Sequence, residues 1–334
     1  MKASDARRKA LIFGLLTLAL LTTATLSLCL GSQPISPAAL MRALLARDTS
    51  DTTYRILVYV RLPRTTAALL AGGALSLSGT LIQAVLRNPM ASPNVIGVNA
   101  GAGFAALLLS VLMPGAAGLS GAAAFAGALV TALFIYALSV RAGLSRTTLI
   151  LAGVAVSSIL NAGINAITLF FPEASIGATG FMLGGFSGVT LTALLAALPY
   201  LLAGALLAAL LRTELNVLQL GDETAASLGL HLQRVRLLSI VAAALLAGAA
   251  VSFAGLLSFV GLLFPHIARR LLGNDNRSLM PAATLLGGVF VLACDIFART
   301  AFAPFEIPVG IVMSLLGGPF FLYLLLRGER RHAA

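Results

Sequence analysis

Long uncharged apolar runs recur from one end of this 334-residue chain to the other. A hydrocarbon layer about 30 Å thick needs about 20 consecutive apolar residues for each helical crossing. Composition agrees with such crossings, since 59% of the residues are hydrophobic, 10% are charged and the mean hydropathy is +1.00. The chain is therefore predicted to be an all-α integral membrane protein.

About ten transmembrane helices are expected, at approximately 11–30, 66–86, 94–112, 117–139, 147–171, 191–211, 235–252, 253–268, 280–298 and 308–326. The division within 235–268 rests on length. A single helix there would be about 50 Å long at about 1.5 Å per residue, which exceeds the hydrocarbon thickness. A break near Gly255 and Gly261 is expected, because glycine tolerates turns and close helix contact.

The placement of basic residues supports an even number of crossings, because Lys and Arg in short loops collect on the cytoplasmic side. With the N-terminus inside, both termini are predicted to be cytoplasmic. The only Lys or Arg residues of the 22 that then fall outside are Arg42, Arg47, Arg55, Arg61, Arg64 and Arg299. Topology thus explains the net charge of +11. No nucleic-acid partner is expected, because the basic residues are dispersed and lack aromatic interleaving.

The whole chain, 1–334, is predicted to be a single transmembrane domain with an outer insertion at about 31–65 and a cytoplasmic segment at about 212–234. The first apolar run resembles a secretory signal. It has full membrane length, however, and Leu28 before Cys29 is a poor lipoprotein-processing site, so it is expected to remain as the first helix. Cys29 and Cys294 are predicted to be buried thiols.

Enzymatic motifs are missing from the sequence. Its only lysines are Lys2 and Lys9, and no phosphate-binding Gly-rich loop precedes either. The histidines are scattered, so no metal-spaced cluster exists. Asp295 is the only acid inside a predicted span, whereas an intramembrane aspartyl protease needs two. The chain is predicted to be non-catalytic, with no metal site and no cofactor of its own.

Proline and glycine clusters mark irregular backbone, which membranes tolerate mainly where it is buried in protein or lines a cavity. They occur at 87–93, 184–188 and 317–319, and the last is expected to interrupt the tenth span. Asp295 and Arg299 are one helical turn apart, which predicts an ion pair. His266 is expected to make a structural hydrogen bond near the cytoplasmic edge.

Several of these segments resemble one family. Its motifs are matched, in order over about 50–327, by Arg61-Leu62-Pro63-Arg64, Gly79 with Gln83, 87–93, 97–102, Leu220-Gly221-Asp222, Leu228-Gly229, 259–262, 265–269, Asp295 with Arg299, and 306–310. The sequence closely resembles the permease subunits of the iron-siderophore, haem and vitamin B12 ATP-binding-cassette importers.

This resemblance implies a vitamin B12 importer permease-like bundle in the bacterial inner membrane, surrounded by membrane lipid. It implies a dimer with a second, identical or related permease chain and one central path. Two ATPase subunits, which carry ATP and Mg, would drive transport. An external substrate-binding protein would deliver the chelate.

Residue roles follow from the same resemblance. Leu220, Gly221, Asp222, Ala226, Leu228 and Gly229 would belong to a short coupling helix that docks on the ATPase, with Asp222 and Glu223 favouring its N-terminus. Arg61, Arg64 and Arg299 would dock the binding protein, because guanidinium forks suit carboxylates. Asn88, Met90 and Ser145 match positions at a cytoplasmic gate.

The expected cargo is a ferric siderophore, the most common cargo among such relatives, with haem and cobalamin as alternatives. A rival function is a secondary carrier driven by protons through His266, Asp295 and Glu306. A structural membrane scaffold without solute flux is a third possibility. The carrier would continue to work without ATP hydrolysis, whereas the importer would not.

Overall fold

The computed structural model describes residues 2–31, 33–143 and 145–329, and this part of the chain is all-α, as predicted. Its helices are α1 (Lys2–Cys29), α2 (Pro37–Ala46), α3 (Thr52–Ile56), α4 (Leu62–Leu86), α5 (Val98–Leu112), α6 (Ser120–Arg141), α7 (Arg146–Phe170), α8 (Pro172–Leu183), α9 (Leu191–Leu210), α10 (Arg212–Leu218), α11 (Asp222–Ser227), α12 (Leu232–Ala254), α13 (Val260–Leu272), α14 (Asn276–Thr300) and α15 (Val309–Glu329). A π-helical turn, Leu57–Arg61, makes α3 and α4 continuous.

Each of the ten predicted crossings has a helix in the structure. Within the described residues, seven helices are long and apolar enough to cross a membrane unaided: Ala6–Cys29, Thr52–Leu86, Ser120–Arg141, Arg146–Phe170, Leu191–Leu210, Leu232–Ala254 and Asn276–Thr300. The other three predicted crossings correspond to α5, α13 and α15. The class of fold is confirmed. The structure also contains a helix at the outer end, α8, that was not predicted from the sequence.

Two of the shorter helices follow non-helical segments. The first, α5, has 15 residues and follows the 3₁₀ turn Pro93–Ile96. The second, α13, has 13 residues and follows the irregular segment 255–259. The expected break therefore occurs at Gly255, where φ is +69°, while Gly261 lies inside the first turn of α13. The expectation of an interruption at 317–319 is wrong, because α15 continues through Pro319.

The helix α4 forms the centre of the bundle. It packs against α12, α13 and α14, and nearly all of its residues are buried. A Cβ atom on Gly79 would clash with the backbone of Gly261 on α13. Glycine at these two positions therefore lets the helices touch backbone to backbone, as small residues do in membrane helix pairs.

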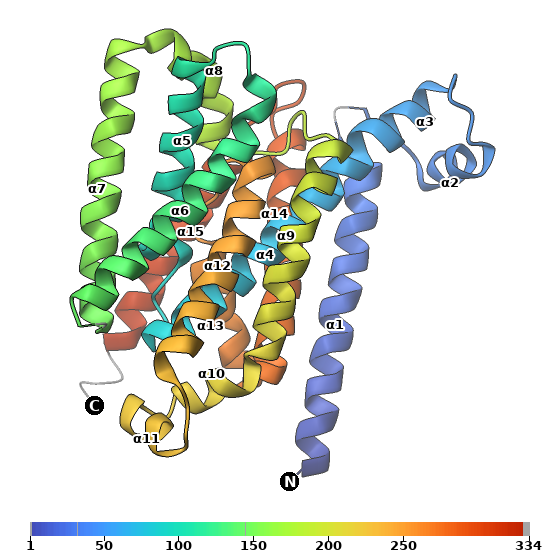
Figure 1. Ribbon diagram of the computed structural model, residues 1–334. Coiled ribbons are helices and arrows are strands. Elements are labelled where there is room, and N and C mark those ends of the chain that lie inside the picture. The colour runs from blue at the N-terminus through green and yellow to red at the C-terminus, as the bar shows by residue number, and fades with distance from the viewer. Residues whose placement is uncertain (1, 32, 144, 330–334) are drawn as a thin grey trace.

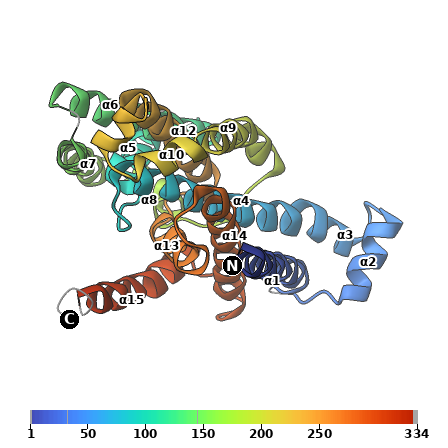
Figure 2. The same ribbon diagram turned by 90° about the horizontal axis from the view of Figure 1, so that it is seen from below.

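Figure 1 shows that α1 begins, and α15 ends, at the same end of the bundle, which also carries α10 and α11. We call this the inner end and the opposite end the outer end, following the charge-based prediction. Seen from the inner end in Figure 2, α2 and α3 extend to the side opposite α7 and α15. The helix α1 is peripheral and packs mainly on α14, with 6% of its apolar window buried.

Candidate functional sites at the two ends of the bundle

A buried network of charges lies at the outer end. Arg64, near the start of α4, donates from Nε to Oδ1 of Asp295 on α14 at 2.9 Å, and its Nη2 lies 2.9 Å from the same oxygen. Its Nη1 donates to Oε2 of Glu306 at 2.8 Å. The side chain of Asp295 is fully buried, whereas that of Glu306 is 36% exposed. Arg64 thus joins a buried carboxylate to one that borders solvent.

Arg299 extends this network to α1. Its Nε lies 3.5 Å from Oδ2 of Asp295, which confirms the predicted ion pair one helical turn apart. Its Nη2 donates to the carbonyl oxygen and to Oγ of Ser27, each at 2.7 Å. The Ser27 hydroxyl also hydrogen-bonds that of Thr65 at 2.7 Å. A peripheral helix is therefore tied to α4 and α14 by polar contacts in its last turn.

Arg61 caps the end of α1. Its Nη1 donates to the carbonyl oxygens of Leu28 at 2.6 Å and Cys29 at 2.8 Å, and its Nη2 donates to the carbonyl of Gln33. The last carbonyls of a helix lack partners within the helix and carry partial negative charge, so a guanidinium there is stabilising. This internal role was not predicted from the sequence.

The three predicted docking arginines are thus buried and paired within the chain. Arg61, Arg64 and Arg299 are 4%, 7% and 3% exposed. Their docking role stays a prediction, and it requires that a partner reach side chains that are buried in this structure. A partner carboxylate that reached Arg64 would compete with Glu306, whose pairing with Arg64 across 242 positions no sequence spacing indicates.

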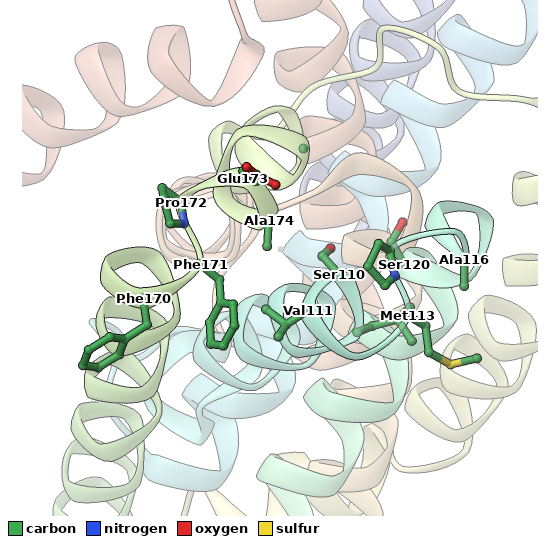
Figure 3. Close-up of a pocket in the computed structure, with 13 residues that line it drawn as sticks. Ser110, Val111, Met113, Ala116, Ser120, Phe170, Phe171, Pro172, Glu173 and Ala174 are labelled. Atoms are coloured by element: carbon green, nitrogen blue, oxygen red, sulfur yellow. The ribbon is translucent and has the colours of Figure 1, made fainter.

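Two of the cavities in the described part of the chain open at the outer end of the main bundle. One, of about 210 Å³, is lined by Arg64, Glu306, the backbone turn at 184–187 and the start of α15. The other, of about 440 Å³, lies between the α5–α6 turn and the α7–α8 corner. Figure 3 shows Phe171 on one side of it and Ser110, Met113 and Ser120 on the other, with Glu173 also at its border. The first cavity adjoins the glycine-rich segment 184–188 that the sequence singled out.

At the inner end, the predicted short helix is present as α11, with Asp222 and Glu223 in its first turn. Leu220 and Leu228, which flank it, are 63% and 64% exposed, and Ala226 is also exposed. Gly221 and Gly229 have φ values of +120° and +83°, a region that favours glycine. The arrangement presents an apolar-flanked helix away from the bundle, as Figure 1 shows.

Asp222 connects this helix to the rest of the inner end. Its Oδ2 accepts a hydrogen bond from Arg236 on α12 at 2.8 Å, and its Oδ1 lies 3.9 Å from Nη1 of Arg87. Arg87 is the C-cap of α4 and directly precedes the proline-rich loop 88–93. The predicted coupling helix and the predicted gate loop are therefore linked by charge, a juxtaposition that the sequence did not predict.

The loop 88–93 is anchored from inside by Gln83. Its Nε2 donates to the carbonyl of Ala91 and to that of Leu262 on α13, both at 3.2 Å, and its Oε1 accepts from Arg269 at 3.0 Å. Asn88 closes a local turn, because its Oδ1 accepts from the backbone N–H of Met90 at 2.9 Å. Movement of this loop would thus act on α13.

Ser145 has a structural role in the described chain. It is the N-cap of α7 and accepts from the backbone N–H of Thr148 at 3.0 Å. It borders a small cavity with Val85 and Leu86 near the end of α4. Within the described ranges, no hydrogen bond joins Ser145 to Asn88 or Met90, so its gate role stays a prediction.

A second polar clamp at the inner end joins α10 to α14. Oδ1 of Asp275, the N-cap of α14, accepts from Nδ2 of Asn216 at 2.7 Å, and Asn216 accepts from the backbone N–H of Asn276 at 2.9 Å. Burial alone would raise the pKa of Asp275. The Arg277 backbone N–H, the Asn216 amide and the charges of Arg277 and Lys9 outweigh burial and hold this pKa below its usual value.

His266 does not make the expected structural hydrogen bond, since neither ring nitrogen has a partner among the described residues. In the described part of the chain, no ion pair or hydrogen bond joins His266 to Asp295 or Glu306, which instead share Arg64. Cys29 and Cys294 are buried free thiols, as predicted. Within the described residues, no group of three His, Cys, Asp or Glu side chains is arranged to hold a metal ion.

Known transport proteins are similar to this chain over nearly its whole length. The FecCD transport family matches residues 18–327. The Fe(3+) dicitrate transport system permease protein FecC of Escherichia coli K12 is 38% identical over 96% of this chain and 98% of its own length. The hemin transport system permease protein HmuU of Yersinia pestis is 35% identical over 92% of this chain and 94% of its own.

Structural similarity agrees with sequence similarity. A solved chain described as an inward-facing conformation of a metal-chelate type ABC transporter matches with a TM-score of 0.83 at 28% sequence identity. The match covers 95% of the present chain and 99% of that chain.

Proposed function

The chain belongs to the FecCD transport family, and from that membership we propose that it is the permease of an ATP-binding-cassette importer that carries a ferric siderophore into the cytoplasm. The observation that supports this best is the near full-length similarity to permeases named for ferric citrate and hemin transport. The chain would act with a second permease chain, two ATPase subunits and an external binding protein. ATP and Mg belong to the ATPase subunits.

Coupling to the ATPase would begin at α11. Its flanking side chains, Leu220 and Leu228, offer an exposed apolar pair that a groove on the ATPase would cover. A shift of α11 would pass through Asp222 to Arg87, and from there to the loop 88–93. Gln83 would carry the movement to α13 through the carbonyl of Leu262. These contacts would form one continuous set of polar interactions that transmits movement of α11 to α13 during alternating access.

The path for the chelate would run past the outer cavities. Large chelates pass most easily along walls that bind weakly, so the mainly apolar cleft beside α8 suits an entry region. The broken segments 93–97 and 255–259 would let α5 and α13 move separately from the long helices. The chain itself does no covalent chemistry in this mechanism.

The test is native mass spectrometry of the complex purified from its own cells, with uptake measured after reconstitution. Two permease chains with two ATPase chains are expected, and the mass of retained ligand would identify a siderophore, haem or cobalamin. Uptake should stop when the ATPase active site is inactivated and continue when the proton gradient is dissipated. Uptake with the opposite sensitivity would overturn the importer and support a proton-driven carrier.

A further inference from the structure

The α2–α3 region lies outside the main bundle at the outer end, beside the end of α1 (Figures 1 and 2). One face of α2 is anchored there. Leu40 is buried in a cluster with Cys29 and Leu57, and Ala43 is buried too. Since α1 is a membrane-spanning helix that ends at Cys29, this contact holds α2 at the level where the hydrocarbon region ends.

The remaining surface of this region carries exposed apolar side chains together with the exposed Arg42 and Arg47. Met41, Leu44 and Leu45 are exposed on α2, with Leu45 at 77%. Tyr59, 65% exposed, and Val60 continue the apolar surface on the turn before α4. Two leucines at the end of α1, Leu26 and Leu30, are exposed as well, at 49% and 37%.

A groove of about 580 Å³ runs beside this surface. Its lining residues include the polar Thr49, Thr52 and Arg55 and the more apolar Ile56, Tyr59 and Val60. Arg55 is the only charged residue in the lining. Two nearby carboxylates are already engaged, because Asp48 accepts from the N–H and hydroxyl of Ser50 and Asp51 caps α3 through the N–H of Thr53. The groove therefore offers one cation and the hydroxyl groups of Thr49, Thr52 and Tyr59 next to the apolar side chains of Ile56 and Val60.

We propose that the α2–α3 region is an interfacial membrane anchor and that its groove binds the phosphodiester of an outer-leaflet phospholipid. Arginine matches phosphate geometry, and an exposed tyrosine suits the boundary between head groups and acyl chains. A helix with uncovered Met and Leu side chains beside arginines is stable lying in that boundary. This inference concerns lipid and does not depend on the solute or on the ATPase.

The absence of tryptophan from the chain permits a direct test. Single reporters Leu45→Trp and Tyr59→Trp replace exposed side chains, and Leu18→Trp, on the exposed face of α1, marks the membrane interior. The full-length chain is reconstituted in vesicles that contain lipids brominated near the head group or deep in the acyl chain. The two anchor reporters should be quenched more by shallow bromines, and the α1 reporter more by deep ones.

Unquenched anchor reporters beside a quenched α1 reporter would overturn the anchor. If those reporters were also blue-shifted, a protein partner rather than lipid would cover the surface. Head-group binding is tested with Tyr59→Trp and bromine carried on phosphatidylglycerol or on phosphatidylcholine at the same mole fraction. Quenching by the anionic lipid should be about twofold stronger or more, because Arg55 raises the local concentration of that lipid.

Arg55→Ala should abolish the preference for phosphatidylglycerol, while Arg141→Ala, an exposed arginine at the inner end, should leave it intact. Equal quenching by both lipids, or an unaffected preference in Arg55→Ala, would overturn the head-group site. Excess inorganic phosphate should leave the preference in place. Its loss would assign the groove to free phosphate and contradict the lipid proposal.

Discussion

Single charged residues at the outer end act on both stability and recognition. Asp295 is fully buried between Arg64 and Arg299, and removal of one partner from a buried ion pair typically costs about 3–5 kcal/mol. Replacing Arg61, Arg64 and Arg299 together by alanine would therefore disturb folding as well as docking. Glu306 is the better position to change, because it is the exposed partner in this network.

If Arg64 receives a carboxylate of the binding protein, Glu306 competes with that carboxylate. Glu306→Gln should then tighten docking several-fold at low salt, since a partly exposed ion pair contributes about 1 kcal/mol or less. The gain should shrink as salt screens the interaction. Affinity is measured with the purified binding protein at several salt concentrations.

Glu173→Gln, at the border of the neighbouring cleft, removes the same charge without touching Arg64 and serves as the matched control. Equal affinities for Glu306→Gln and the unmodified permease at every salt concentration would remove Arg64 from the docking site.

At the scale of elements, two of the polar connections at the inner end join helices that are distant in sequence and can be tested separately. One runs from α11 through Asp222 to Arg87 and the loop 88–93. The other joins α10 to the start of α14 through Asn216 and Asp275. A single substitution can remove either connection. The first substitution is expected to change the coupling of transport to ATP hydrolysis, and the second is expected to change stability.

Asp222→Ala should lower transport per ATP hydrolysed by about two- to fivefold, because a partly exposed charged contact is worth about 0.5–1 kcal/mol. ATP hydrolysis by the assembled complex should fall less than transport. Glu223→Ala, which changes the exposed neighbour on α11, is the control. It should change neither transport per ATP hydrolysed nor ATP hydrolysis itself. Parallel loss of hydrolysis and transport in Asp222→Ala would mean that the residue serves ATPase assembly and not transmission to Arg87.

Asp275 should make stability depend on pH. Its pKa in the folded chain lies below the ordinary aspartate value of about 3.9. Its carboxylate therefore stabilises the folded chain above about pH 4, and this contribution disappears as pH falls through the lower folded-state pKa. Asp275→Asn should reduce stability at neutral pH and remove this part of the acid dependence, measured by unfolding in detergent across pH. A variant with unchanged acid dependence would contradict the assignment.

At the scale of the whole molecule, the bundle combines long lipid-facing helices with short helices that begin inside it. The short helices α5 and α13 are possible because their broken ends are covered by protein. For example, the backbone N–H of Leu256 donates to the carbonyl of Phe181, and Asn99 donates to the carbonyl of Leu257. These contacts give the backbone N–H and C=O groups hydrogen-bond partners that lipid tails could not provide. Such packing requires close approach at α4.

Gly79→Ala should destabilise the bundle by several kcal/mol, because the added methyl group meets the backbone of Gly261 and only a backbone shift relieves the overlap. The free energy of unfolding in mixed detergent is the measurement. Gly177→Ala, in α8, is the matched control, since its methyl group would meet no atom within 4 Å. Equal stability of the two variants would show that α4 and α13 separate easily.

Much of this architecture was predictable because it depends on local properties. Apolar length predicted a helix at each of ten places, and glycine at position 255 predicted the break after α12. The ion pair of Asp295 with Arg299 followed from helical spacing. The interruption expected at 317–319 did not occur, since a proline in a membrane helix leaves few backbone groups unpaired and neighbouring helices accommodate them.

The sequence by itself determined the membrane class, the approximate spans, the sided distribution of charge and the family, because each depends on residue type and on spacing along the chain. Only the tertiary structure decided that Arg61 and Arg64 are internal partners and that Asp222 lies beside Arg87. Those contacts join residues from different helices, as Arg64 and Glu306 do across 242 positions. Their pairing depends on how helices cross in a low-dielectric interior, where an unpaired charge is too unfavourable to remain.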